Sequence, residues 1–165
     1  MTWLPIDGAG TTDDVFALAP DIYEHYRELN QRLWRDGQLD PAVLELCRLR
    51  MAQLIGSTAE LDVRHDVAAE IAQAQLENLR QWPTSPAFGP RERAALAFAE
   101  KYVIDAHSIT DEDCAELNLH FTPAELTTLT TGLAMFDAMA RFRVALGCAA
   151  PPPGPSPTTA DAPLP

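Results

Sequence analysis

The sequence predicts an all-α protein: a bundle of six or seven helices in a single domain, followed by a proline-rich C-terminal tail. Three observations carry this prediction. Apolar residues recur at the three- and four-residue spacing of amphipathic helices, and helix-start signals precede most of these stretches. No alternation of apolar and polar residues reaches the length of a strand. The 165 residues suit one domain, and 47 % of them are hydrophobic, which is enough for a core.

The first expected helix spans about 21–35, because Ile22, Tyr26, Leu29 and Leu33 form one apolar stripe. A short helical turn over 14–18 is a possible addition before it.

A second helix is expected to begin at Asp40-Pro41, where a carboxylate can cap the helix and proline suits its first position. It continues to Gly56, a residue typical of helix ends. Directly afterwards, Ser57 followed three residues later by Glu60 has the pattern of a capping box. We therefore expect a third helix from this point that continues through Ile71 toward Leu79.

Three further helices are expected in the C-terminal half. Pro90 opens the first, and Thr110, followed by three carboxylates, opens the second. The segment 122–125 reads Thr-Pro-Ala-Glu, a capping box that opens the last helix, and this helix runs to Gly147.

These elements suggest three regions of chain: an N-terminal segment over 1–19, a helical domain over 20–148 and a tail over 149–165. The tail holds half of the 14 prolines of the chain and lacks the apolar residues of a core, so we expect it to be disordered.

Composition excludes several classes of function. The net charge of −12 disfavours binding to nucleic acid, because phosphate backbones are repelled. No apolar run reaches the ~20 residues that span a bilayer, and no signal peptide is evident, so a cytoplasmic location is expected. The 3 cysteines lack CxxC spacing, which is typical of free thiols in a reducing compartment.

Four segments together resemble the carboxymuconolactone decarboxylase / alkylhydroperoxidase D-like (AhpD-like) family. Residues 45–56 read ELCRLRMAQLIG and are similar to the helix that precedes the family's redox centre, roughly E-x-x-R-L-R-x-x-Q-x-x-G. Residues 90–100 look like the next helix, 107–111 like the following loop, and 136–147 like the closing helix. The resemblance covers about 20–147 and implies an AhpD-like helical bundle that assembles into dimers, trimers or hexamers.

The resemblance also implies a chemistry that this chain cannot perform in the usual way. The family's best understood activity is peroxide reduction by a CxxC pair with a Glu and a His as proton relay, while other members decarboxylate a lactone acid without a dithiol. On the family's spacing, the two cysteines fall at Ser57 and Glu60 and the histidine at Arg64, and only the upstream glutamate, Glu45, is kept. Neither a hydroxyl nor a carboxylate can cycle through a disulfide.

We therefore expect a non-redox acid/base enzyme, decarboxylase- or isomerase-like, acting on a small anionic or carbonyl substrate. Glu45 is the candidate general acid or base. Glu60 and Arg64, four residues apart on the expected helix, form a candidate ion pair in which the arginine binds the anion. His65 titrates near neutrality and completes the candidate catalytic set.

Three further residues are candidates for binding the substrate. They are Ser57, next to the candidate catalytic residues in the sequence, and Asp137 and Arg141 on the closing helix. These residues also have purely structural interpretations. Ser57 and Glu60 suit a capping box without catalysis, Glu60 and Arg64 an ordinary surface pair, and Glu45 a structural pair with Arg48 or Arg141.

Two other functions remain open. The chain is alternatively a non-catalytic pseudoenzyme that serves as an oligomeric assembly module, or it keeps residual peroxidase activity through Cys47 or Cys114. No HExxH pattern or paired histidines occur, so neither a metal nor another cofactor is expected.

Overall fold

The computed structural model describes residues 2–8, 10–65 and 71–149. Within these ranges the chain forms eight α-helices and two 3₁₀ turns, without a strand. The predicted all-α fold is confirmed, and the additional helices are short. The α-helices are α1 (Thr12–Phe16), α2 (Pro20–Arg35), α3 (Pro41–Ile55), α4 (Thr58–Leu61), α5 (Gln73–Asn78), α6 (Pro90–Asp105), α7 (Asp111–His120) and α8 (Pro123–Leu146).

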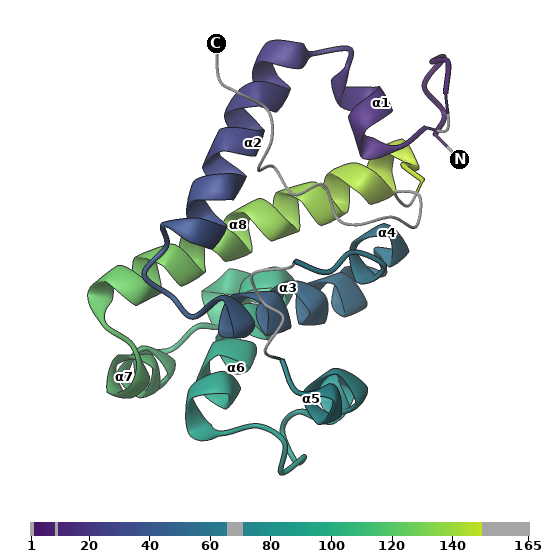
Figure 1. Ribbon diagram of the computed structural model, residues 1–165. Helices are drawn as coiled ribbons and strands as arrows, with labels where there is room; N and C mark the ends of the chain where they lie inside the picture. The colour runs from purple at the N-terminus through teal and green to yellow at the C-terminus, as the bar shows by residue number, and fades with distance from the viewer. Residues whose placement is uncertain (1, 9, 66–70, 150–165) are drawn as a thin grey trace.

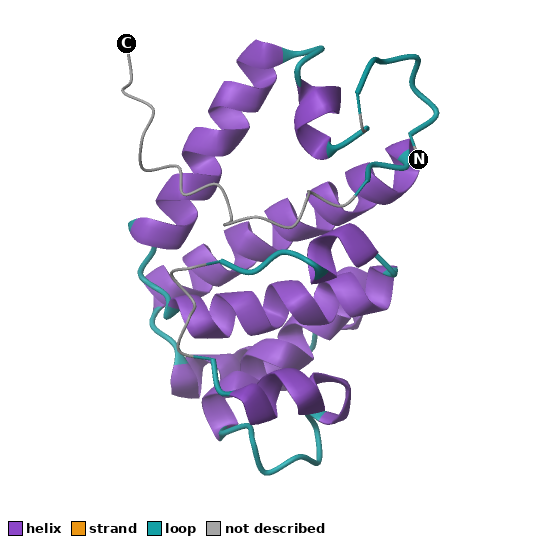
Figure 2. Ribbon diagram, turned by 45° about the vertical axis from the view of Figure 1, so that its right-hand side comes forward, coloured by secondary structure: helices purple, strands orange, loops and turns teal. Residues whose placement is uncertain are grey.

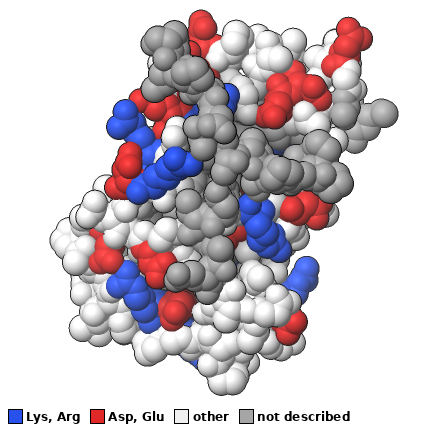
Figure 3. All heavy atoms as spheres, viewed as in Figure 1, with Lys and Arg blue, Asp and Glu red and all other residues white. Residues whose placement is uncertain are grey.

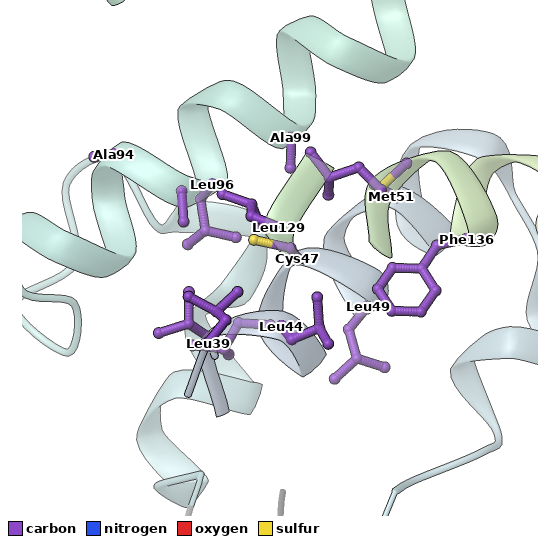
Figure 4. Packing of buried hydrophobic residues seen from close by; sticks show 14 of the residues in the cluster. Leu39, Leu44, Cys47, Leu49, Met51, Ala94, Leu96, Ala99, Leu129 and Phe136 are labelled. Carbon is purple, nitrogen blue, oxygen red and sulfur yellow. The ribbon is translucent and has the colours of Figure 1, made fainter. Parts of the chain in front are cut away.

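Helix α3 lies at the centre of the bundle, between α6 and α8 (Figures 1 and 2). Its side chains are buried almost all the way round, so it serves as the axis on which the other helices pack. Figure 4 shows the Cys47 sulfur of α3 pointing toward Leu96 of α6 and Leu129 of α8. These three side chains are fully buried, so Cys47 is part of the hydrophobic core.

The expected helix starts are confirmed where the signal is local. The Asp40 carboxylate accepts a hydrogen bond from the Ala42 N–H at 2.8 Å, and α3 ends at Gly56 with a φ of 78°. Thr122 and Glu125 form the expected capping box at the start of α8. Thr110 caps α7 in the same way, with Asp113 as its reciprocal partner.

The third expected helix is wrong in its extent. Helix α4 ends at Leu61, the next described helix is α5, and residues 62–65 between them are not helical. Residues 66–70, over which the sequence predicts that the helix continues, lie outside the described residues, as does the tail from 150 onward.

The N-terminal segment lies against the end of α8. The Trp3 indole donates to the Ala145 carbonyl at 2.8 Å, and the Ala149 N–H donates to the Gly10 carbonyl at 2.8 Å. The rings of Phe16 and Phe142 stack with centroids 4.9 Å apart. This segment therefore brings α1 onto one end of the bundle (Figure 1).

In the described part of the chain, no helix has both the length and the apolar character required to cross a bilayer.

Candidate functional site

The candidate site is built around Arg48, a buried arginine in the middle of α3. Its guanidinium binds the Glu45 carboxylate with both arms of the fork, Nε to Oε2 at 2.7 Å and Nη2 to Oε1 at 2.8 Å. Arg48 and Glu45 lie one helical turn apart, and their exposed fractions are 2 % and 1 %, respectively. The structural partner expected for Glu45 is therefore Arg48, and the pair fixes the carboxylate in place.

Arg48 also joins α3 to the segment that follows it. Its Nη1 donates to both the Oε2 of Glu60 at 2.6 Å and the Glu60 carbonyl at 2.8 Å, while Nη2 donates to the Val63 carbonyl at 2.8 Å. With the two bonds to Glu45, these contacts occupy all the N–H groups of the guanidinium. A buried arginine satisfied in this way anchors the short α4 helix and the chain after it.

A second arginine, Arg143 near the end of α8, completes the cluster. Its Nη1 contacts the Oε1 of Glu60, so the Glu60 carboxylate lies between two guanidinium groups. Its Nε donates to the Thr12 hydroxyl at 2.9 Å. Glu45, Arg48, Glu60 and Arg143 thus form a chain of alternating charges, which we call the buried ion cluster.

Tyr26 of α2 lies beside Arg143 at the outer end of the cluster. Burial raises the pKa of the Tyr26 hydroxyl, and the nearby Arg143 guanidinium opposes that rise. Burial also lowers the pKa of Arg143. The Tyr26 hydroxyl therefore stays protonated and neutral at physiological pH.

Ser57 departs from its expected role as a helix cap. It occupies the position before α4, but its side chain makes no capping hydrogen bond to the described residues. Its hydroxyl is fully buried and has no hydrogen-bond partner within residues 2–8, 10–65 and 71–149. An unsatisfied buried hydroxyl costs about 1–3 kcal/mol, and such a group calls for an explanation.

The expected pairing of Glu60 with Arg64 is also wrong. Because α4 ends at Leu61, the two residues are not one turn apart on a helix, and Glu60 binds Arg48 and Arg143 instead. The Arg64 side chain is exposed, and its Nη1 donates to the Leu61 and Val63 carbonyls at 2.5 and 2.8 Å.

His65, at the end of the described segment after α4, contacts helix α2. Its ring stacks on the indole of Trp34 in α2, with centroids 4.0 Å apart and planes 18° apart. The buried Trp34 Nε1 has no hydrogen-bond partner in the part of the chain that the structure describes. The chain leads from His65 back to the cluster through Val63, two residues earlier, whose carbonyl Arg48 binds.

Asp137 and Arg141, the candidates on the closing helix, pair with each other. The Arg141 Nε donates to the two Asp137 carboxylate oxygens at 2.8 and 3.0 Å, and Nη2 donates to the Val103 carbonyl at 3.3 Å. The residue that α8 contributes to the cluster is Arg143, two positions farther along the chain.

The thiols lie in three different environments. Cys47 is fully buried, and burial raises its pKa well above its ordinary value. Cys114 is exposed on α7, whereas Cys148 is partly buried near Arg143. Since peroxide is attacked by a thiolate, Cys47 is a poor candidate for residual peroxidase activity.

Among residues 2–8, 10–65 and 71–149, no group of three or more His, Cys, Asp or Glu side chains is arranged to hold a metal ion.

Sequence reasoning misses the parts of the cluster that depend on tertiary contacts. It identifies Arg48 only as a structural partner of Glu45, and it does not select Arg143, Tyr26 or Thr12. A signal for Arg48 exists: it stands three residues from Glu45 in a helix whose other residues are mostly apolar, where an unpaired charge is unfavourable. No local pattern points to Arg143.

Comparison with known proteins identifies the family. The carboxymuconolactone decarboxylase family matches residues 20–101. The uncharacterized protein YnjA of Escherichia coli (strain K12) is 31 % identical over 110 residues, which make up 66 % of this chain and 60 % of that protein. The chain therefore spans less than two thirds of the length of this relative.

Solved structures share the fold at low sequence identity. A protein of unknown function from Agrobacterium tumefaciens, associated by name with the antioxidant defence protein AhpD, has a TM-score of 0.74 and 18 % identity, covering 84 % of this chain and 96 % of its own. A variant of the debrominase Bmp8 in which a cysteine is replaced by alanine, in complex with 2,3,4-tribromopyrrole, has a TM-score of 0.73 and 15 % identity. The match covers 83 % of this chain and 74 % of that chain. The chain belongs to the carboxymuconolactone decarboxylase/AhpD-like family, and it does so without a CxxC pair.

Proposed function

We propose that the protein is a non-redox acid/base enzyme that acts on a small substrate carrying a carboxylate and a carbonyl group. The observation that supports this most is the buried ion cluster, which places two carboxylates and two guanidiniums where the family resemblance expects the redox centre. Burying three charges and partly burying a fourth is costly, and apolar side chains of similar size often serve stability as well or better. A cluster with this energetic cost favours a role in chemistry.

The members of the cluster differ in how firmly they are held. Glu45 is fixed bidentately by Arg48 and is 1 % exposed, so it is the less suitable of the two carboxylates for contact with a substrate. Glu60 is 7 % exposed and lies between Arg48 and Arg143. We therefore assign proton transfer to Glu60, with Glu45 and Arg48 positioning it, instead of to Glu45 as expected from the sequence.

Arg143 is the proposed binding group for the substrate carboxylate. When the substrate binds, the Arg143 guanidinium would leave the Glu60 carboxylate and pair with the substrate carboxylate instead. The Glu60 carboxylate would then be available as a base. The Ser57 hydroxyl, which is buried without a partner among the described residues, supplies a donor for the substrate carbonyl oxygen. The Arg64, His65, Asp137 and Arg141 side chains stay candidates for contacts farther from the reacting atoms.

The proposed reaction balances without a redox partner. Glu60 removes a proton from the carbon next to the carbonyl, and the electron pair of the broken C–H bond moves into an enolate whose oxygen accepts from Ser57. Return of the proton from Glu60 to a different carbon gives an isomer. In a decarboxylation, the C–C bond breaks instead, carbon dioxide leaves, and a proton is added to the enolate.

Deuterium exchange tests this proposal even while the substrate is unidentified. A panel of small keto acids and unsaturated lactone acids, carboxymuconolactone among them, is incubated in D₂O and followed by ¹H NMR. We expect the wild type to exchange the proton next to the carbonyl, or to release carbon dioxide, from at least one member. Glu60→Gln should slow this about 100-fold or more, whereas Glu116→Gln, the same change at an exposed site on α7, should not.

A non-catalytic role is the second candidate, and one observation favours it. All N–H groups of Arg48 are occupied by acceptors within the chain, so this part of the cluster needs no ligand to be satisfied. Absence of exchange, of turnover and of ligand-induced line broadening across the whole panel would support this second role and contradict the first.

The region boundaries also stay proposals. We propose residues 20–148 as the folded domain, 1–19 as a segment that completes the site through Thr12, and 149–165 as a tail. A cytoplasmic location is proposed with them.

A further inference from the structure

Helix α2 is attached to the rest of the described chain along one side only. Leu33 and Trp34 at its C-terminal end are buried, and the half-buried Tyr23 and Tyr26 stack on Phe16 of α1. In both views the helix stands at the edge of the molecule, away from α6 and α7 (Figures 1 and 2). On its opposite side, large apolar side chains are exposed, and no described element covers them.

The open side of α2 forms a continuous surface, which we call the outer α2 face. Its members are all exposed and recur at three- and four-residue spacing, so they share one side of the helix. They are Asp21, Ile22, His25, Glu28, Leu29 and Arg32. The exposed fractions of Ile22 and Leu29 are 65 % and 48 %, which are high values for aliphatic residues on one helix.

The charges of this face are ordered along the helix. Its acidic members, Asp21 and Glu28, precede its basic member, Arg32, and a further exposed arginine, Arg35, follows. Figure 3 shows acidic side chains over the start of α2, and both acidic and basic side chains farther along it. A helix with this order is complementary to a copy of itself that runs in the opposite direction, because each acidic end then meets a basic end.

We propose that the outer α2 face pairs with the same face of a second copy of this chain in an antiparallel, twofold arrangement. A twofold contact is self-complementary, so each side chain meets its symmetry-related counterpart. With the axis near His25, Ile22 lies against Leu29 of the second copy, and Leu29 against its Ile22. Arg32, which already binds Glu28 at 2.8 Å, lies near Asp21 of the second copy.

The geometry supports this pairing over a random apolar contact. Viewed down the helix, Ile22 and Leu29 lie on one flank of the face, and Asp21, Glu28 and Arg32 lie on the other. An antiparallel twofold pair brings like flanks together, so apolar side chains meet apolar ones while the charged flanks meet along the other edge. Helices packed in this way approach to about 8–10 Å between axes, which brings the two His25 positions close together.

The first test measures the mass of the full chain in solution by light scattering and sedimentation. We expect a dimer, or a larger assembly with an even number of chains. Ile22→Glu should weaken association at least about tenfold, because it places two carboxylates in the apolar flank. Ile104→Glu is the matched control, since Ile104 on α6 is 69 % exposed and lies outside the face. Circular dichroism should show that both variants keep the helical fold.

The second test detects the twofold axis directly. In a Cys114→Ser background, which removes the exposed native thiol, His25→Cys should give a covalent dimer with a short bis-maleimide reagent. Ile104→Cys in the same background should not. A wild-type chain that is monomeric at about 100 μM would overturn the proposal, as would an assembly that survives Ile22→Glu but is disrupted by Ile104→Glu. Dimerisation that appears only after removal of 150–165 would also overturn it, since the tail would then be the occupant of the face.

Discussion

Arg48 on α3 holds the carboxylate and the backbone carbonyl of Glu60 with the same nitrogen, at 2.6 and 2.8 Å. The other nitrogens of the guanidinium bind Glu45 and the Val63 carbonyl. One arginine therefore fixes the conformation of the chain after α3 and places the carboxylate that faces Arg143. In a chain without a CxxC pair, this contact has the central position in the site.

Replacing Arg48 should be among the most destabilising changes in the protein. Arg48→Met leaves Glu45 as an unpaired buried carboxylate and removes one of the two partners of Glu60, which should cost about 3–5 kcal/mol of unfolding free energy. Urea denaturation at neutral pH measures this loss. Arg32→Met, which breaks only the exposed pair with Glu28, is the control and should change stability by less than about 1 kcal/mol. Equal effects of the two substitutions would contradict the proposed anchoring role.

Ser57→Ala should not weaken the fold. The Ser57 hydroxyl is buried without a partner among the described residues, so its removal relieves a desolvation cost, and the variant should be as stable as the wild type or up to about 1 kcal/mol more stable. Ser85 is the matched control, because this buried serine accepts a hydrogen bond from the Ala87 N–H at 3.3 Å. Ser85→Ala should therefore destabilise by about 1 kcal/mol. Thermal unfolding of both variants decides the point, and a clear loss of stability in Ser57→Ala would show that the hydroxyl has a partner in solution.

Local sequence signals are sufficient to predict most of the fold. A helix begins where a side chain satisfies the free N–H groups of the first turn, and the residues that do so at Asp40 and Thr122 stand next to the helices they cap. The three- and four-residue spacing of apolar positions then identifies the helix that follows. These signals act over a few residues, so they are readable without tertiary structure.

The candidate site is predictable only in part, because its contacts are not local. Ser57 and Glu60 have the spacing of a capping box, yet Glu60 is drawn to Arg48 and Arg143, and Ser57 is left buried without a partner in the described chain. Pairing with one buried and one partly buried guanidinium outweighs a cap that yields about 1 kcal/mol. Glu45 and Glu60 can be selected from the family spacing, but the arginine that joins them to α8 cannot.

Gly132→Ala should destabilise the packing of α8 on α3. A methyl group at Gly132 would lie 2.6 Å from Cδ1 of Leu44, a fully buried side chain that has little room to move. Overpacking of this kind costs about 1–3 kcal/mol, which exceeds the gain of up to about 1 kcal/mol in helix propensity. Urea denaturation should therefore show a net loss. Thr131→Ala at the neighbouring exposed position should be neutral or slightly stabilising, and a stabilised Gly132→Ala variant would contradict the close packing of the two helices.

Glu125 should make stability depend on acid pH. The backbone N–H of Thr122, the Arg91 guanidinium and the Thr122 hydroxyl lower the pKa of Glu125 to about 2 from an ordinary value of 4.5. A carboxyl whose pKa is depressed in the folded state adds stability that is complete above the unfolded pKa and is lost as the pH falls toward the folded pKa. The difference in unfolding free energy between wild type and Glu125→Gln should thus be largest near pH 7 and shrink between about pH 4.5 and pH 2. A difference that is constant over this interval would contradict the assignment.

On the function proposed above, the carboxylates of the ion cluster, and not the thiols, carry the chemistry of this protein. The most direct measurement compares a thiol-free variant, Cys47→Ala with Cys114→Ser and Cys148→Ser, with Glu60→Gln in the deuterium-exchange and decarboxylation assay. We predict that the thiol-free variant keeps the wild-type rate, whereas Glu60→Gln loses about 100-fold or more. A thiol-free variant that loses activity while Glu60→Gln retains it would contradict the claim.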